Sequence, residues 1–227
     1  MGEGLGAGTL TDLDQTIRKG SLCLSRTETA TIMTFSAEDG LRFFRLQQEI
    51  DLDECRRVQA LGCPDCGGPL DRNDHARKPR GLPYQHFDCA PRRLNLCCRH
   101  CRAHNMPESV VYLGRRVYVG VVMALASILV SGLTPRRLAR VQAALGVSAQ
   151  TVRRWRQWWQ SGFVASRFWA ERRGLFLPPV AVAQLPNDLV DRFAGETGAA
   201  RLLALLRFLS PLSVTLREGR GSKVNFA

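Results

Sequence analysis

Six of the eight cysteines lie between residues 62 and 116, and their spacing could hold a metal ion. Cys63 and Cys66 form one CxxC pair, and Cys98 and Cys101 form a second. Two such pairs supply four thiolates, the ligand set of a closed tetrahedral zinc site of the structural kind. Because each pair gives two ligands from one tight turn, a bound Zn2+ would tie two distant turns together and could decide whether the segment folds.

The identity of the four ligands is open at the level of the sequence. Cys97 stands beside Cys98 and gives a CxxxC spacing to Cys101. On a strand, neighbouring side chains point to opposite faces, so only one of the two adjacent cysteines easily reaches a metal. Other candidate ligands are Cys89, His86 and His100. Catalytic zinc is disfavoured, because catalytic sites keep an open position and usually use histidine or carboxylate ligands.

The 31 residues between the two CxxC pairs exceed the roughly 15–20 of common zinc ribbons. Most of this insert is polar and basic, which favours an extended hairpin loop. Cys23 and Cys55 lie outside the segment, and we expect them to be ordinary thiols. Cytosolic cysteines normally stay reduced, so metal binding is favoured over disulfides.

A second pattern, in residues 133–160, predicts a helix-turn-helix. Thr134 can cap a helix that has Pro135 at its first position, where proline is favoured. Gly146 then ends this helix, and Ser148 can cap a second one. Apolar residues recur at helical spacing in both segments: Leu138, Val141, Ala144 and Leu145, then Val152, Trp155 and Trp159. Two helices joined by a short glycine turn form the arrangement of DNA-binding helix-turn-helix domains.

In such a domain the second helix enters the major groove of duplex DNA. Its predicted outward face carries Gln150, Arg153, Arg154 and Gln157. Arginine can pair with guanine, and glutamine with adenine, through two hydrogen bonds each. Phosphate contacts, which position a protein without reading sequence, are expected from Thr151, Arg136 and Arg137. The alternative is an amphipathic helical pair with a solvated arginine face.

The positive charge of the chain is concentrated where these two patterns lie. Formal net charge is +12, and residues 61–175 hold 19 basic and 6 acidic side chains, whereas residues 1–60 hold 7 and 10. Nearly all the basic residues are arginines, which suit phosphates and guanine edges. A segment this basic favours a polyanion, most simply nucleic acid. A genome rich in G and C would explain the use of arginine over lysine but not the clustering.

These patterns predict an α+β fold: a small zinc ribbon followed by a mainly α-helical helix-turn-helix domain. Two short helices, about 37–49 and 51–61, are expected to pack on the next module, because their apolar residues are too few for a core. With 7% aromatic residues, the core is expected to be mostly Leu, Val and Ala. The predicted units are a disordered N-terminus (1–35), a helical lead-in (36–61), the ribbon (62–116), the helix-turn-helix domain (117–175) and a helical C-terminal extension (176–227).

Two apolar stretches have alternative interpretations. Residues 117–133 are apolar on all sides but number 17, short of the roughly 20 of a membrane span, so we expect a buried helix. Residues 198–212 predict a helix with a leucine face, which could pack inside its own domain or against a second copy in a homodimer. That face consists of Leu202, Leu205, Leu206 and Leu209.

No secretory signal is found, and we expect a cytoplasmic, nucleoid-associated protein without membrane contact.

Together the two patterns resemble the DNA-recognition proteins and N-terminal regions of bacterial insertion-sequence transposases. The resemblance covers about residues 62–173 and depends on CPDCGG…CCRHCR, the run SVVYLGRRVYVG and the sequence TVRRWRQWW. It implies that a zinc ribbon precedes a helix-turn-helix and that the pair recognises the ends of a mobile element. It also implies metal ligation by Cys63, Cys66, Cys98 and Cys101, and DNA contact by Arg153, Arg154 and Gln157. The long insert departs from the commonest ribbon.

No nuclease domain is predicted, because a transposase cuts and joins DNA with carboxylates that hold two metal ions. The 52 residues beyond 175 are too few and too helical for such a core. We therefore expect a non-catalytic protein that binds double-stranded DNA for a mobile genetic element: a transposase accessory, a regulator or a transposase remnant. A transposase encoded nearby is a candidate partner. The alternatives are a chromosomal transcription regulator and an RNA-binding zinc-ribbon protein; a small zinc enzyme would need an open metal position.

Overall fold

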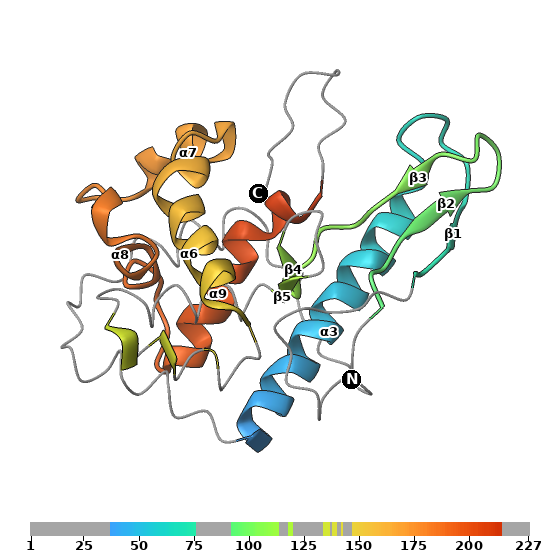
Figure 1. Ribbon diagram of the computed structural model, residues 1–227. Helices are drawn as coiled ribbons and strands as arrows, with labels where there is room; N and C mark the ends of the chain where they lie inside the picture. The colour runs from blue at the N-terminus through green and yellow to red at the C-terminus, as the bar shows by residue number, and fades with distance from the viewer. Residues whose placement is uncertain are drawn as a thin grey trace.

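The computed structural model describes residues 37–75, 92–113, 118–119, 134–136, 138–139, 142 and 147–214 (Figure 1). The helices are α3 (Ala37–Leu61), α6 (Ala149–Gln157), α7 (Arg167–Arg172), α8 (Asn187–Val190) and α9 (Gly198–Leu209). A π-helical turn covers Trp158–Phe163, and 3-10 turns cover Arg173–Leu175, Val182–Gln184 and Ser210–Ser213. The strands are β1 (Leu70–Arg72), β2 (Leu96–Cys98), β3 (His104–Asn105), β4 (Tyr112–Leu113) and β5 (Tyr118–Val119). The predicted disordered N-terminus lies outside the described residues.

Helices combined with a small antiparallel sheet confirm a mixed α+β class at this level. We call residues 62–75 and 92–106 the ribbon, and residues 147–214 the helical body. In Figure 1 the three strands of the ribbon lie along the C-terminal half of α3, and helices α6 to α9 gather on the other side of β4 and β5.

Helix α3 is one continuous helix of 25 residues, so the prediction of two short helices is wrong. Its buried face changes partner near Asp51, which is why the pattern looks broken. Before that point Phe43 and Phe44 join the core of the helical body, and after it Cys55 joins the small cluster of the ribbon. The expectation that this segment packs on the next module is confirmed for its C-terminal half, which packs on the ribbon, whereas the packing of its N-terminal half on the helical body was not predicted.

The ribbon is a hairpin of β1 and β2 with β3 added on the other side of β2. Leu70 pairs with Cys98 and Arg72 with Leu96, in antiparallel register. Pairing continues beyond the strands, because a further bridge joins His75 to Arg93. The predicted extended hairpin is therefore confirmed as far as this bridge, and its tip, residues 76–91, lies outside the described residues.

The apolar run 117–133 does not begin as a helix. Tyr118 and Val119 form β5, which pairs antiparallel with β4 through Leu113 and Tyr112. Valine and tyrosine favour a pleated strand over a helix, and this preference decides the local structure. Residues 120–133 lie outside the described residues, so the rest of the predicted buried helix stays a prediction. Among the helices that the structure describes, none is long and apolar enough to cross a membrane.

The core of the helical body combines leucine and valine side chains, as expected, with a group of aromatic rings that the composition did not lead us to expect. Aromatic residues are concentrated here, and their rings contact one another in edge-on, tilted or stacked arrangements: Trp158, Trp159, Phe163, Phe168, Trp169, Phe176, Phe193 and Phe208. The π-helical turn gives room to two adjacent buried tryptophans. A Cβ on Gly162 would lie 2.8 Å from Cδ1 of Trp158, so this turn requires glycine there.

The leucine face of α9 is buried inside this same core. Leu202, Leu205, Leu206 and Leu209 are all 0% exposed and belong to the cluster that contains the aromatic rings. Of the two alternatives for this face, packing within the chain is therefore the observed one. The leucine face is therefore not on the surface of the chain, and the homodimer stays a prediction.

A set of buried polar side chains joins α3 to the segment before β4 and to the C-terminal end of α9. The Asp51 carboxylate accepts hydrogen bonds from the Ser109 hydroxyl and, at 2.7 Å, from the Val110 amide. The Ser109 amide donates to the Ser213 hydroxyl at 2.8 Å. We call the following five buried residues the buried joint: Gln47, Asp51, Arg93, Ser109 and Ser213.

The buried joint predicts a pH dependence of stability. Burial raises the pKa of Asp51 from 3.8 to about 6, although bonds from Ser109 and Val110 and the charge of Arg93 act in the lowering direction. The folded state is therefore more stable when the Asp51 carboxyl is protonated. Its contribution to the free energy of unfolding is present below about pH 3.8 and is lost as pH rises through about 6, by at most about 3 kcal/mol.

The variant Asp51→Asn has no such titration, and every other pH effect is shared with the wild type. Subtracting the variant's free energy of unfolding from that of the wild type should give a difference that falls as pH rises from about 4 to about 7. Urea unfolding at a series of pH values measures it. A difference that stays constant over this range would contradict the buried-carboxyl account.

Candidate functional site

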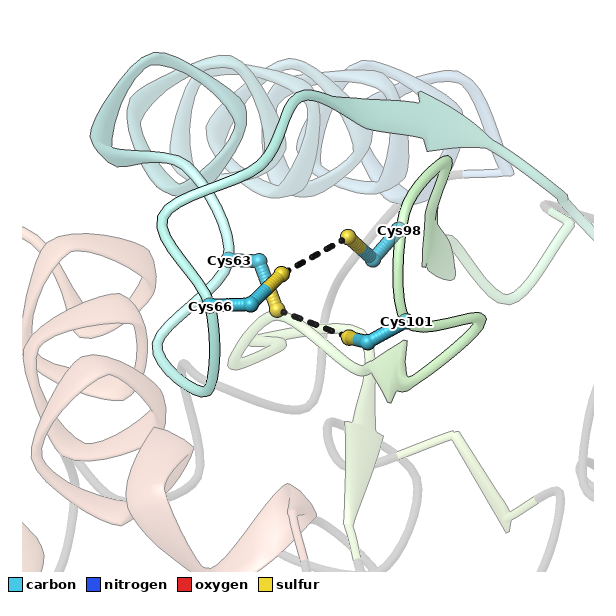
Figure 2. Close-up of side chains that lie close together, drawn as sticks. All are labelled: Cys63, Cys66, Cys98 and Cys101. Carbon is cyan, nitrogen blue, oxygen red and sulfur yellow. Dashed lines mark hydrogen bonds between the residues drawn. The ribbon is translucent and has the colours of Figure 1, made fainter.

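The four predicted ligands come together in one cluster. The sulfur atoms of Cys63, Cys66, Cys98 and Cys101 all lie within 4.8 Å of one another, a group that could hold a metal ion. Figure 2 shows the side chains of the two CxxC turns pointing toward each other. Two sulfur pairs, Cys63 with Cys101 and Cys66 with Cys98, are separated by 3.6 and 3.5 Å. These distances exceed the roughly 2.05 Å of a disulfide and approach the about 3.8 Å between two thiolates on one tetrahedral zinc ion.

The two CxxC turns have the same backbone hydrogen bonds. In the first, the Cys63 amide donates to Gly68 O at 2.9 Å and the Gly67 amide donates to Cys63 O at 2.7 Å. The second turn has the same two bonds at the same spacing. The Cys98 amide donates to Ala103 O at 2.9 Å, and the Arg102 amide donates to Cys98 O at 3.1 Å. Each turn therefore places its two thiols on one side by the same local geometry.

The second hydrogen bond of each turn requires a left-handed backbone at the residue after the pair. Gly67 has φ 70° and its counterpart Arg102 has φ 60°. Glycine adopts this conformation freely, whereas arginine does so at a cost of order 1–3 kcal/mol. Gly68 is required for a different reason, because a Cβ there would lie 2.7 Å from His100 Nδ1 and 3.1 Å from Cys98 Sγ. The strained backbone of Arg102 is not apparent from the sequence.

Backbone amides and neighbouring thiols make the four cysteines unequal. The Cys101 amide donates to the Cys98 sulfur and is the main cause that lowers the pKa of Cys98 to about 6. The pKa of Cys101 is raised to about 12: the Ala103 amide acts to lower it, but contacts with the Cys66 thiol and with other thiols, together with burial, outweigh that effect. Ionisation of one thiol thus makes ionisation of a neighbouring thiol less favourable. A bound cation removes this penalty, because it stabilises all the thiolates together.

The other candidate ligands stand outside the cluster or outside the described residues. Cys97 points away, with its sulfur 3.8 Å from the carbonyl oxygens of Cys98 and Arg102. His100 lies over Gly68 but does not belong to the group that could share a metal ion. The remaining two candidates, Cys89 and His86, fall in 76–91, outside the described residues. Cys55 is a buried thiol of the ribbon cluster whose pKa burial raises, as expected for an ordinary thiol.

Helix α6 has the buried and exposed faces that the sequence predicts. Ser148 caps it by accepting from the Thr151 amide at 3.2 Å. Its inner face is buried through Val152 and Trp155, and Trp159 follows in the π-helical turn. The four side chains predicted to read bases are all exposed: Gln150, Arg153, Arg154 and Gln157. Thr151 is half-buried, and its hydroxyl hydrogen-bonds the Ser148 hydroxyl at 3.0 Å.

The first predicted helix of the helix-turn-helix is described only in part. Pro135, Arg136, Leu138, Ala139 and Gln142 are helical, and the Leu138 amide donates to Thr134 O at 3.1 Å. Arg136 is exposed. The other predicted phosphate contact, Arg137, and the glycine turn at 143–146 lie outside the described residues. The helix-turn-helix as a unit therefore stays a prediction.

Comparison with protein-family models, with curated proteins and with solved structures finds no match to this chain. The resemblance to transposase-associated proteins therefore stays a hypothesis that depends on the residues quoted for it.

Two serine variants test which thiols belong to the cluster. Cys66→Ser removes one of the four candidate ligands. If a metal ion holds the ribbon, this variant should lose the metal and become protease-sensitive, because metal binding would supply much of the folding free energy. Cys97→Ser is the matched control: Cys97 lies one residue before Cys98 in β2 but outside the cluster, so this variant should keep its metal and its protease resistance. Metal content after gel filtration and limited proteolysis are the measurements. Retention of stoichiometric metal by Cys66→Ser, or its loss from Cys97→Ser, would refute this ligand set.

The two left-handed positions give a test of the turn geometry. A Cβ on Gly67 meets nothing within 4 Å, so Gly67→Ala isolates the backbone effect and should destabilise the metal-loaded protein by about 1 kcal/mol. Arg102→Gly removes the equivalent strain and should not destabilise it, although glycine loses more entropy on folding. The urea midpoints of the two variants and of the wild type measure these effects. A Gly67→Ala variant that is more stable than Arg102→Gly would contradict this turn geometry.

Proposed function

We propose that the four-cysteine cluster is a structural zinc site. Four thiolates from two CxxC turns leave no position for a substrate or water on a tetrahedral ion, as in zinc sites that serve folding. Thiolates also select zinc over harder cations such as magnesium or calcium. Cys63 and Cys98 are buried and Cys66 and Cys101 are exposed, so bound zinc would sit at the surface of the ribbon with its ligands tying both turns together.

We further propose that the protein binds double-stranded DNA through α6. The observation that carries this proposal is the contrast between the two faces of that helix. Val152 and Trp155 anchor one face in the core, while Arg153, Arg154 and the two glutamines of the other face are exposed. Arginines held by a rigid, capped helix can present their donors to guanine edges in the major groove. Arg136 would add a phosphate contact.

An RNA-binding alternative is less well supported by the aromatic residues. Single-stranded nucleic acid is usually held by bases stacked on exposed aromatic side chains. All four tryptophans of the chain, Trp155, Trp158, Trp159 and Trp169, are buried in the core of the helical body. They therefore serve packing, and duplex DNA is the better candidate.

The biological setting follows from the resemblance alone. A non-catalytic role in a mobile genetic element, as an accessory, regulator or remnant of a transposase, fits a protein with a closed metal site and a DNA-reading helix. A chromosomal transcription regulator would use the same parts. Footprinting on inverted-repeat DNA from the neighbouring genome separates the two, because only the first role requires those repeats.

Fluorescence anisotropy of the zinc-loaded protein with duplex DNA over a salt series tests the DNA proposal. We expect binding that weakens steeply with salt, because arginines displace counterions from phosphates. The double variant Arg153→Ala plus Arg154→Ala should lose about 2–6 kcal/mol of specific binding, at about 1–3 kcal/mol for each base contact, and should keep the fold.

The matched control is Arg56→Ala plus Arg57→Ala, two adjacent exposed arginines of α3 that are ion-paired to Asp53 and Glu54. This control loses the same charge but should keep most of the affinity. An equal loss in both double variants would mean that only net charge matters. No binding to duplex DNA at low salt would contradict the proposed function.

A further inference from the structure

The ribbon and the helical body are connected by more than the chain between them. The C-terminal half of α3 packs on the ribbon through Leu52, Cys55 and Val58, and the Gln59 side-chain amide donates to Leu70 O at 2.8 Å. The N-terminal half of the same helix packs on the helical body. A change in the structure of the ribbon can therefore alter the position of α3, which also packs against the helical body.

Arg93 makes the second connection. It lies on the ribbon hairpin, where its backbone bridges His75, and it is only 7% exposed. Its guanidinium reaches out of the ribbon and donates to two carbonyl oxygens, Pro107 O at 3.0 Å and Ser213 O at 3.2 Å. Ser213 closes the 3-10 turn that follows α9, so this one side chain ties the ribbon to the C-terminal end of the helical body.

A continuous series of ring contacts leads from that end of α9 to α6. Phe208 of α9 lies 5.1 Å from Phe168, and Phe168 lies 6.2 Å from Phe163, measured between ring centroids. Phe163 in turn lies 4.9 Å from Trp159, in the π-helical turn that continues α6. Close-packed rings transmit a displacement instead of absorbing it, because protein interiors contain little free volume.

We propose that metal binding at the four-cysteine cluster and duplex binding at α6 are thermodynamically coupled through Arg93 and the rest of the buried joint. The proposal rests on the proposed function and adds to it a regulation by metal. Without metal the ribbon keeps a cluster of only six buried residues, three of them cysteines, which is too small to hold the hairpin. The Arg93 side chain is then no longer held in position, and the carbonyl oxygens of Pro107 and of Ser213, in the C-terminal turn of the helical body, each lose one hydrogen-bond donor.

Coupling of this kind is reciprocal. If metal raises the affinity of the protein for duplex DNA by some factor, duplex DNA raises the affinity for metal by the same factor. We expect about a tenfold factor, within the range usual for coupled sites. The ribbon need not touch DNA for this effect.

The experiment compares zinc-loaded and chelated full-length protein by two readouts. The first is affinity for a mixed-sequence duplex at low salt. The second is hydrogen exchange of α6 and of the turn Ser210–Ser213 without DNA. Arg93→Met keeps the apolar stem but removes both carbonyl contacts. Arg99→Met is the matched control, because Arg99 is a ribbon arginine that pairs at the surface with Asp71.

In the wild type and in Arg99→Met, zinc should raise duplex affinity about tenfold and slow exchange in α6. In Arg93→Met, zinc should still bind, but both effects should shrink to less than about threefold. If Arg93→Met fails to hold zinc, Ser213→Ala alters the joint from the side of the helical body and should give the same reduction.

Equal affinity of the zinc-loaded and chelated wild type for duplex DNA overturns the coupling and leaves the proposed function standing. Absence of duplex binding in both states overturns the proposed function, and hydrogen exchange then decides the coupling alone. The coupling is overturned if zinc does not change hydrogen exchange in α6. It is also overturned if zinc changes this exchange equally in Arg93→Met and Arg99→Met.

Discussion

The four-cysteine cluster is the constraint on which the proposed stability of the ribbon rests, because the apolar cluster of its described residues is small. Six buried residues form its cluster, and three of them are Cys55, Cys63 and Cys98. Hydrophobic burial on this scale does not offset the entropy of ordering a hairpin and two tight turns. Four sulfurs within 4.8 Å can supply the missing free energy when they bind a cation, and the lowered pKa of Cys98 beside the raised pKa of Cys101 means that these thiols do not all ionise with equal ease in the absence of a cation.

The helical body has the opposite character. Its aromatic rings and the leucine face of α9 form a dense core, and α6 is fixed to that core by Val152 and Trp155. A helix held in this way can expose Arg153 and Arg154 without strain. The buried joint lies between the two regions, where Asp51 and Arg93 make hydrogen bonds that neither region could make alone. A small element with a four-cysteine cluster is thus combined with a large hydrophobic one, and α3 packs against both.

Features governed by local chemistry were the ones that the sequence could predict. The CxxC spacing located the four sulfurs, and the Ser148 cap with its apolar spacing located α6 and both its faces. The errors came from long-range contacts. The single helix α3 was read as two because its partner changes at Asp51. Tyr118–Val119 was read as helix for a local reason, because the apolar run that it begins hides the strand preference of valine and tyrosine and the short hairpin with β4. The aromatic core was missed because overall composition does not show that rings are concentrated in one region. Arg93 looked like any other arginine, since the carbonyl of Ser213 lies 120 residues away.

The central claim is that a metal ion holds the ribbon, and native mass spectrometry of the full chain tests it most directly. The protein would be purified without added metal and measured before and after treatment with a chelator, with hydrogen exchange of β1 and β2 followed in parallel. The account predicts one zinc ion per chain, and rapid exchange in both strands once the ion is removed. A metal-free chain whose β1 and β2 remain protected would contradict it.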